Sequence, residues 1–160
     1  MSPKLDLTEQ ILEFLQEALK AELTAVHQYL LHAKVCQNWG YSRLAQRNRA
    51  ESLEELAHAE AIIERMLFLK GSPRVTDLSD IKECGDVKEQ LESDLALEMD
   101  ALERLNSAVK IAREASDDAS GQLFSKILAD EDHHVDYLEA QLHVIGEIGL
   151  ANYLTQQIEK

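Results

Sequence analysis

Residues 51–63 read ESLEELAHAEAII, and residues 127–139 read ILADEDHHVDYLE. Each stretch contains one Glu-x-x-His motif, and the second motif follows the first after 76 residues. Residues three apart on a helix share one face, so each motif can present a carboxylate oxygen and an imidazole nitrogen to a common point. The motif residues are Glu55 with His58 and Glu131 with His134.

The same offset relates two further glutamates, Glu22 and Glu98, each of which precedes a motif glutamate by 33 residues. Chance explains part of the pattern, because 19 glutamates and six histidines in 160 positions would produce about 0.7 such motifs. A single motif therefore also fits a solvated helix face. The shared offset predicts instead that each half of the chain supplies one glutamate and one Glu-x-x-His motif to the same site.

The glutamates of this repeat interrupt stripes of apolar residues at helical spacing, which places them in the predicted core. The flanking residues are Leu15, Leu19 and Val26 for Glu22; Leu91, Leu95, Leu102 and Leu105 for Glu98; and Phe124, Ile127, Leu128, Val135 and Leu138 for Glu131. Burying an unpaired carboxylate is strongly unfavourable, so a bundle that buries four of them must protonate them or surround a cation. A bound metal is the simpler explanation.

The six side chains predict a site for two divalent metal ions. In this arrangement Glu22 and His58 bind one ion, Glu98 and His134 bind the other, and Glu55 and Glu131 bridge the two. Four carboxylates offset the charge of two divalent ions. Mixed oxygen and nitrogen ligands favour iron or manganese over the copper(I) and structural zinc that thiolate-rich sites select.

Tyr29 lies one turn beyond Val26 on the face of Glu22. At that position it can act as a hydrogen-bond donor beside the site, as a radical trap, or simply as a core tyrosine. The remaining histidines show no comparable set of partners, and we expect surface or packing roles for them. They are His27, His32, His133 and His143.

Glycine and proline are rare and lie between long segments of helical periodicity, which predicts an all-α antiparallel four-helix bundle. The bundle is expected over about 8–146 of a single domain 1–160. The expected features are a stop at Gly40, helix caps at Ser42 and in the capping-box pattern Asp86–Glu89, a long crossover over about 72–85, and a short C-terminal helix over about 149–158.

The net charge is −14, with 45% hydrophobic residues. This acidic balance disfavours nucleic acid and anionic membranes as partners, because both need a basic patch. The chain shows neither a signal peptide nor an apolar run long enough for a membrane span, so a cytoplasmic location is expected. Cys36 and Cys84 form no CxxC pair and are expected to be ordinary thiols.

Nearly the full length of the chain resembles the bacterioferritins, members of the ferritin-like di-iron family. The segments that carry the resemblance are Ala21-Glu22-Leu23, His27-Gln28-Tyr29, Asn38-Trp39-Gly40, Ile63-Glu64-Arg65, Ser93-Asp94-Leu95-Ala96-Leu97-Glu98 and Gly149-Leu150-Ala151-Asn152-Tyr153-Leu154. The resemblance implies a ferritin-like fold and a hollow cage of twenty-four subunits. In that cage Fe(II) is oxidised by O2 or H2O2 at an intrasubunit di-iron ferroxidase centre, and the ferric mineral is stored inside.

On that resemblance the six predicted ligands form the di-iron centre, Tyr29 is the tyrosine beside it, and Glu51 lies at the channel to it. Two positions depart from the family. Leu56 stands where bacterioferritins carry the methionine that binds haem b between two subunits, and Ala50 stands where some relatives carry a histidine for iron on the inner surface. A homomeric cage should therefore lack haem, unless the chain joins a mixed cage with a methionine-bearing partner subunit.

In the family that this chain resembles, a small ferredoxin reduces the stored iron for release and acts at the haem. Because Leu56 has no donor atom for haem, this partner is also in question.

Two other functions stay open. One is a small di-iron oxidase or peroxide scavenger that forms a dimer and stores no mineral. The other is a structural subunit without catalysis, which the complete set of six ligands disfavours.

Overall fold

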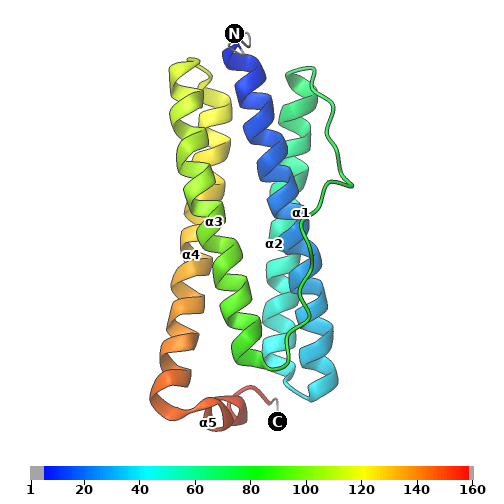
Figure 1. Ribbon diagram of the computed structural model, residues 1–160, viewed down its shortest axis with the longest axis vertical. Helices are drawn as coiled ribbons and strands as arrows, with labels where there is room; N and C mark the ends of the chain where they lie inside the picture. The colour runs from blue at the N-terminus through cyan, green and yellow to red at the C-terminus, as the bar shows by residue number, and fades with distance from the viewer. Residues whose placement is uncertain (1–5, 159–160) are drawn as a thin grey trace.

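The computed structural model describes residues 6–158 and contains helices but no strand in that range. Four long helices form an antiparallel bundle, and a short fifth helix lies at one end of it (Figure 1). They are α1 (Leu7–Trp39), α2 (Ser42–Phe68), α3 (Val87–Glu114), α4 (Asp118–Ile148) and α5 (Leu150–Thr155). None of these helices is long and apolar enough to cross a membrane. The predicted all-α four-helix bundle is confirmed.

The connections determine which helices pair. Gly40 ends α1 in the left-handed conformation, with φ of 90°, which confirms the predicted stop and lets α2 return beside α1. Residues 69–86 then run along the outside of the bundle from the end of α2 to the start of α3 (Figure 1). This long crossover makes α1 with α2 and α3 with α4 the two antiparallel pairs.

Three expected helix ends differ in detail. Ser42 is the first residue of α2 and not its N-cap. Tyr41 occupies the N-cap position, and the Tyr41 side chain forms no capping hydrogen bond. Asp86 caps α3 by accepting a hydrogen bond from Glu89 N at 2.8 Å, but the Glu89 carboxylate accepts from Gly85 N and so does not complete the capping box. The C-terminal helix ends at Thr155, where the next amide, that of Gln156, bonds to the Tyr153 carbonyl three residues back.

Buried polar side chains of α1 fasten the crossover to the bundle. The amide group of Gln28 pairs with the Lys82 backbone, accepting from its N–H at 2.9 Å and donating to its carbonyl at 2.9 Å. Gln16 pairs with Arg74 in the same two-bond manner. The three fastening contacts are Gln16 with Arg74, Thr24 with Ser79, and Gln28 with Lys82.

We expect Gln28→Leu to loosen this part of the crossover. The substitution removes both hydrogen bonds to the Lys82 backbone, and a hydrogen bond of this kind contributes about 0.5–1.5 kcal/mol to stability. Hydrogen exchange of a peptide spanning residues 79–85 should become faster, while Gln37→Leu, an exposed position on the same helix, should leave it unchanged. Equal protection in both variants would show that Gln28 does not fasten the crossover.

The apolar core consists of two clusters, one toward each end of the bundle. The larger contains the buried residues Leu15, Leu19, Ile62, Leu105, Phe124 and Ile127 with their neighbours, and the smaller contains Leu44, Leu91, Leu138, Ile145 and Tyr153 with theirs. On every long helix, the residues of the predicted metal site lie between the segments that contribute to the two clusters. Apolar packing on both sides therefore fixes the position of a polar layer near the middle of the bundle.

Both cysteines are free thiols, as expected. Cys36 is buried, and its Sγ lies 3.1 Å from Gln90 Oε1. Burial, followed by the nearby Asp94 charge, raises the pKa of the Cys36 thiol to about 11. Cys36 therefore stays protonated at neutral pH and serves as a small packed side chain.

Candidate metal centre

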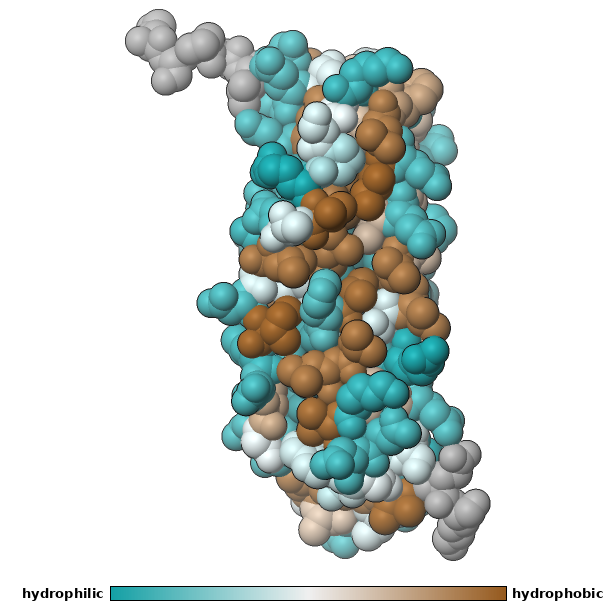
Figure 2. Space-filling model, turned by 90° about the vertical axis from the view of Figure 1, so that its right-hand side faces the viewer, coloured by the Kyte–Doolittle hydropathy of each residue, from teal (hydrophilic) through white to brown (hydrophobic). Residues whose placement is uncertain are grey.

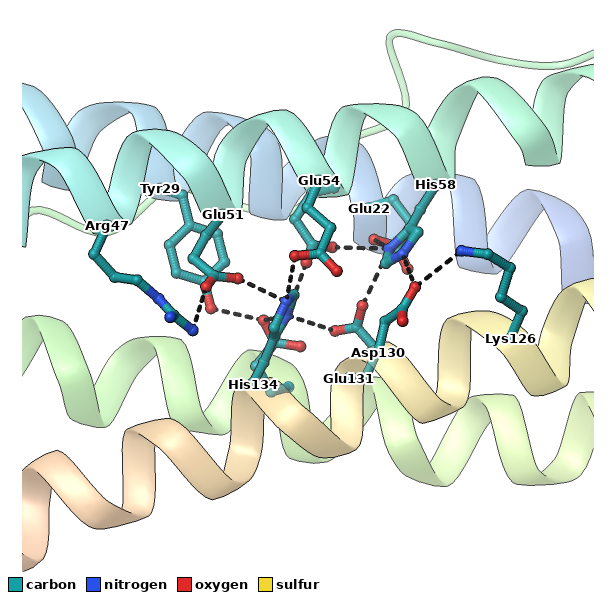
Figure 3. A network of polar contacts seen from close by, with 12 residues as sticks. Glu22, Tyr29, Arg47, Glu51, Glu54, His58, Lys126, Asp130, Glu131 and His134 are labelled. Atoms are coloured by element: carbon teal, nitrogen blue, oxygen red, sulfur yellow. Dashed lines mark hydrogen bonds and ion pairs between the residues drawn. The ribbon is translucent and has the colours of Figure 1, made fainter.

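The structure brings all six predicted ligands together in the middle of the bundle (Figure 3). Each of the four long helices contributes, and every one of the six residues is between 1% and 4% exposed. The contributions are Glu22 from α1, Glu55 and His58 from α2, Glu98 from α3, and Glu131 and His134 from α4. Their role as metal ligands remains a prediction. The structure nevertheless brings together the six side chains that are related by the 76-residue repeat.

One half of the site surrounds the Nδ1 atom of His58. This nitrogen lies 3.4 Å from Glu22 Oε2, 3.8 Å from Glu55 Oε2 and 3.2 Å from Glu131 Oε1. One ligand atom from each of these four residues falls within 4.8 Å of all the others. Three carboxylate oxygens and one imidazole nitrogen at this separation can enclose a single divalent ion.

The other half surrounds the Nδ1 atom of His134. This nitrogen lies 3.0 Å from Glu55 Oε1, 3.3 Å from Glu98 Oε1 and 3.6 Å from Glu131 Oε2. Glu55 and Glu131 thus belong to both halves, and each directs one carboxylate oxygen to His58 and the other to His134. These are the two residues that the sequence predicts as bridges.

Several polar atoms in the site lack a hydrogen-bond partner. Among the described residues these buried atoms include Glu22 Oε2, Glu55 Oε1, His58 Nδ1 and Glu131 Oε1. Buried polar groups are normally satisfied, so unpaired acceptors that face one point favour a bound cation. The donor set therefore fits a pair of metal ions.

The outer nitrogens of the two histidines contact a second group of carboxylates. His58 Nε2 donates to Asp130 Oδ2 at 2.8 Å, while His134 Nε2 lies 2.6 Å from Glu51 Oε2 and 3.1 Å from Glu54 Oε2 (Figure 3). A proton held on Nε2 leaves the Nδ1 lone pair free for a metal ion. The outer carboxylates therefore set the orientation and tautomer that the site needs.

Sequence reasoning missed Glu54 and Asp130, although the signal was present. Each directly precedes a motif glutamate, and the two are separated by the same 76 residues as the rest of the repeat. In the structure each contacts the histidine of the other half: Asp130 pairs with His58, and Glu54 with His134. Glu51, which the resemblance places at a channel, is 6% exposed and lies against His134 and Arg47.

Protons offset part of the negative charge of the site. Burial raises the pKa of the Glu22 carboxyl well above its ordinary value, and the Glu55 charge adds to this effect. Burial alone would lower the pKa of His58 and of His134, but the carboxylates that surround each ring, Glu131 first, outweigh it and raise both pKa values well above the ordinary range. At neutral pH both imidazoles therefore carry a second proton that a metal ion must displace, and Glu22 binds a proton more readily than an ordinary glutamate.

Tyr29 contacts the site directly, since its hydroxyl donates to Glu98 Oε1 at 2.6 Å. The side chain is 2% exposed, and burial followed by the Asp94 and Glu55 charges raises its pKa well above the ordinary value. The phenol is therefore neutral and orients the Glu98 carboxylate. Of the three roles considered for Tyr29, the structure shows the hydrogen-bond donor.

His32 has more partners than expected. It is 1% exposed, its Nδ1 lies 3.0 Å from Asp94 Oδ1, and its Nε2 accepts from Gln28 at 2.9 Å. His32 therefore has the packing role expected for it, but its contact with Asp94, 62 residues away on α3, could not be predicted because no local spacing reveals it. The other three histidines, His27, His133 and His143, are exposed as expected.

The ferritin-like domain family matches residues 12–148 of the chain. The bacterioferritin of Mycolicibacterium paratuberculosis is 42% identical over 151 residues, which cover 94% of this chain and 95% of that protein. The chain belongs to the bacterioferritin family. The bacterioferritin of Streptomyces coelicolor is also 42% identical, covering 94% of this chain and 90% of its own. A solved structure of mycobacterial bacterioferritin superposes with a TM-score of 0.92 at 44% identity, covering 94% of this chain and 93% of that one. The predicted resemblance and the ferritin-like fold are confirmed.

Proposed function

We propose that this bacterioferritin stores iron, and that it oxidises Fe(II) at the paired site before depositing the ferric product inside a cage of twenty-four subunits. Family membership supports iron storage. The sharing of Glu55 and Glu131 between the two halves supports oxidation, because bridging carboxylates hold two metal ions close enough to react with one oxidant molecule. In balanced form, two Fe(II), one O2 and two protons give two Fe(III) and one H2O2.

The surrounding residues have separate tasks in this reaction. Asp130 and Glu54 hold the Nε2 protons of the histidines, so that each Nδ1 faces the iron. Tyr29 orients Glu98 by donating a hydrogen bond to its Oε1 atom. Hydrogen peroxide can take the place of O2 as the two-electron acceptor.

The direct test combines oxidation with retention of iron. Protein freed of metal and then given Fe(II) in air should oxidise it faster than buffer does, and should retain much more than two irons per chain in a particle of cage size. Glu22→Ala and His58→Ala should slow the oxidation. A dimer that retains about two irons per chain would support the smaller di-iron oxidase instead.

Assembly is supported by the surface of the α1–α2 pair. Figure 2 shows a long apolar band on the face that these helices and the crossover form. Large exposed apolar patches mark surfaces that other proteins cover. The exposed large apolar residues of these two helices are Leu7, Leu30, Trp39, Leu53, Leu56, Leu67 and Phe68.

The residues present do not fit haem bound through a thioether. Leu56, at the family's haem-ligating position, is 38% exposed on α2 and has no donor atom. Of the described methionines, Met66 is buried in the core and Met99 is on α3. The purified homomer should therefore show no Soret band when it is produced with ample haem. A band that corresponds to one haem for every two subunits would contradict this prediction, whereas haem in a co-produced cage with a methionine-bearing subunit would support a mixed assembly.

Metal binding should release protons and weaken as the pH falls. Because the pKa values of His58 and His134 are raised above the ordinary range, about two protons, one from each imidazole, leave for every two ions bound near neutral pH. Calorimetric titration with Zn(II) in buffers of different ionisation enthalpy measures this number. His133→Ala, at an exposed neighbouring position, should release the same number. Binding that neither releases protons nor depends on pH would contradict the charge balance described above.

A further inference from the structure

The 76-residue repeat that relates the two halves of the metal site is broken at Glu51. Glu51 Oε2 lies 2.6 Å from His134 Nε2, but the residue 76 positions after Glu51 is Ile127, which is buried and apolar. The outer carboxylate next to each motif glutamate follows the repeat, whereas Glu51 does not. The outer nitrogen of His134 therefore has a buried carboxylate that the repeat does not supply to His58.

A second break in the repeat concerns the glutamates of α1 and α3. Tyr29 donates a hydrogen bond to Glu98 Oε1 at 2.6 Å, but the residue 76 positions after Tyr29 is the buried Leu105. A leucine at that position cannot orient Glu22 by a hydrogen bond. Both breaks thus add a polar contact to the same half of the site, the half that contains His134.

Arg47 holds Glu51 in its place beside His134 (Figure 3). Arg47 Nη2 lies 2.6 Å from Glu51 Oε1, and the guanidinium carbon lies 3.9 Å from the centre of the Tyr137 ring. Stacking on the ring restricts the orientation of the guanidinium plane. Because Arg47 and Glu51 belong to α2 while Tyr137 and His134 belong to α4, the contacts run from α4 to α2 and back to the metal site.

The half of the site that contains His58 has a different arrangement. At the positions related by the repeat to the arginine and to the tyrosine, the chain carries Leu123 and Ala61. The carboxylate that contacts His58 pairs instead with Lys126, whose side chain is 73% exposed. An exposed lysine pair gives little positional restraint, so the two halves differ in how firmly their outer contacts are fixed.

We propose that Arg47 is a positioning residue which, through Glu51, makes the metal position at His134 the tighter of the two, so that this position fills first. Ligands that already have the binding geometry lose less freedom when the ion arrives, which raises affinity. The position at His58 then receives the second ion and completes the pair that the oxidation requires. This inference rests on the proposed function, because it assigns an order of loading to the same site.

The test compares the occupancies of the two metal positions within one crystal. Crystals of the metal-free protein receive one Co(II) per chain, and anomalous scattering at the cobalt edge measures each position. For two independent, tightly binding positions that share one ion, a tenfold difference in affinity gives an occupancy ratio of about three. In the wild-type protein the position at His134 should be occupied about threefold more than the position at His58, or by a larger factor.

Tyr137→Leu removes the ring and leaves every charge in place. Constant charge is necessary here, because the positive charge of Arg47 by itself opposes a nearby cation. Without the ring the guanidinium can turn toward solvent, and the affinity of the position at His134 should fall about tenfold, which lowers the occupancy ratio about threefold. Tyr137→Phe keeps the ring and should keep the wild-type ratio.

A double variant tests whether the ring acts through the arginine. In an Arg47→Gln background, Tyr137→Leu should leave the occupancy ratio unchanged, because no guanidinium remains to be held. An equal drop of the ratio with and without Arg47 would overturn the proposal. A wild-type protein with equal occupancies or with a preference for the position at His58, or a Tyr137→Leu protein with the wild-type ratio, would overturn it as well.

The test can fail while the proposed function stands, because it involves no oxidation and no storage of iron. A wild-type protein that binds Co(II) at neither position would instead show that the proposed function itself is wrong.

Discussion

Glu131→Gln is expected to lower the rate of Fe(II) oxidation by about 100-fold or more, because it removes a bridging anion from both halves of the site at once. Glu131 is 1% exposed and directs Oε1 toward His58 and Oε2 toward His134. Glutamine keeps the volume of the side chain, so the fold should persist. Its single neutral carbonyl oxygen, however, cannot serve two cations.

Stopped-flow oxidation in air and anaerobic Co(II) titration should both report this loss, the second as fewer than two tightly bound ions per chain. Glu139→Gln provides the matched control, since Glu139 is exposed on the same helix. An oxidation rate within about twofold of wild type in a folded Glu131→Gln cage would exclude Glu131 from the reaction.

Asp130→Asn is expected to lower metal affinity and oxidation rate by about 10- to 100-fold, although Asp130 is not among the six predicted ligands. The Asp130 carboxylate accepts the Nε2 proton of His58 at 2.8 Å. An asparagine amide can donate to that nitrogen instead, and the ring would then carry its proton on Nδ1, facing the metal site. The variant thus disfavours the tautomer that binds metal.

Controls separate this effect from a general loss of charge. Asp132→Asn removes an exposed carboxylate two residues away, and Lys126→Gln removes the other partner of Asp130, which lies 3.1 Å from it. Both should remain within about threefold of wild type, and Asp130→Glu should recover part of the activity. If Asp130→Asn binds Co(II) as tightly as wild type, the outer carboxylates do not control the histidines.

The fold was predictable from the sequence because each long helix repeats its apolar residues over many turns and ends at a clear signal, such as Gly40. The predictions that were wrong concern the exact ends of single helices. Tyr41, not Ser42, precedes α2, and the Glu89 carboxylate turns to Gly85. These outcomes depend on local backbone geometry, which the pattern of residue types does not specify.

The residues of the candidate site were predictable where they follow the internal repeat of the sequence. The 76-residue offset identified six side chains that the structure brings together, and the same offset extends to Glu54 and Asp130. The His32–Asp94 contact leaves no periodic signal, because it depends on how separate helices pack. Predicting such a contact requires coordinates.

The most direct test of the account is anomalous scattering at the iron edge from crystals loaded with Fe(II) under anaerobic conditions. The account predicts two iron peaks in every subunit, about 3.5–4 Å apart, with Glu55 and Glu131 between them and the Nδ1 atoms of His58 and His134 on opposite sides. A single peak, or peaks that Glu55 and Glu131 do not touch, would contradict it.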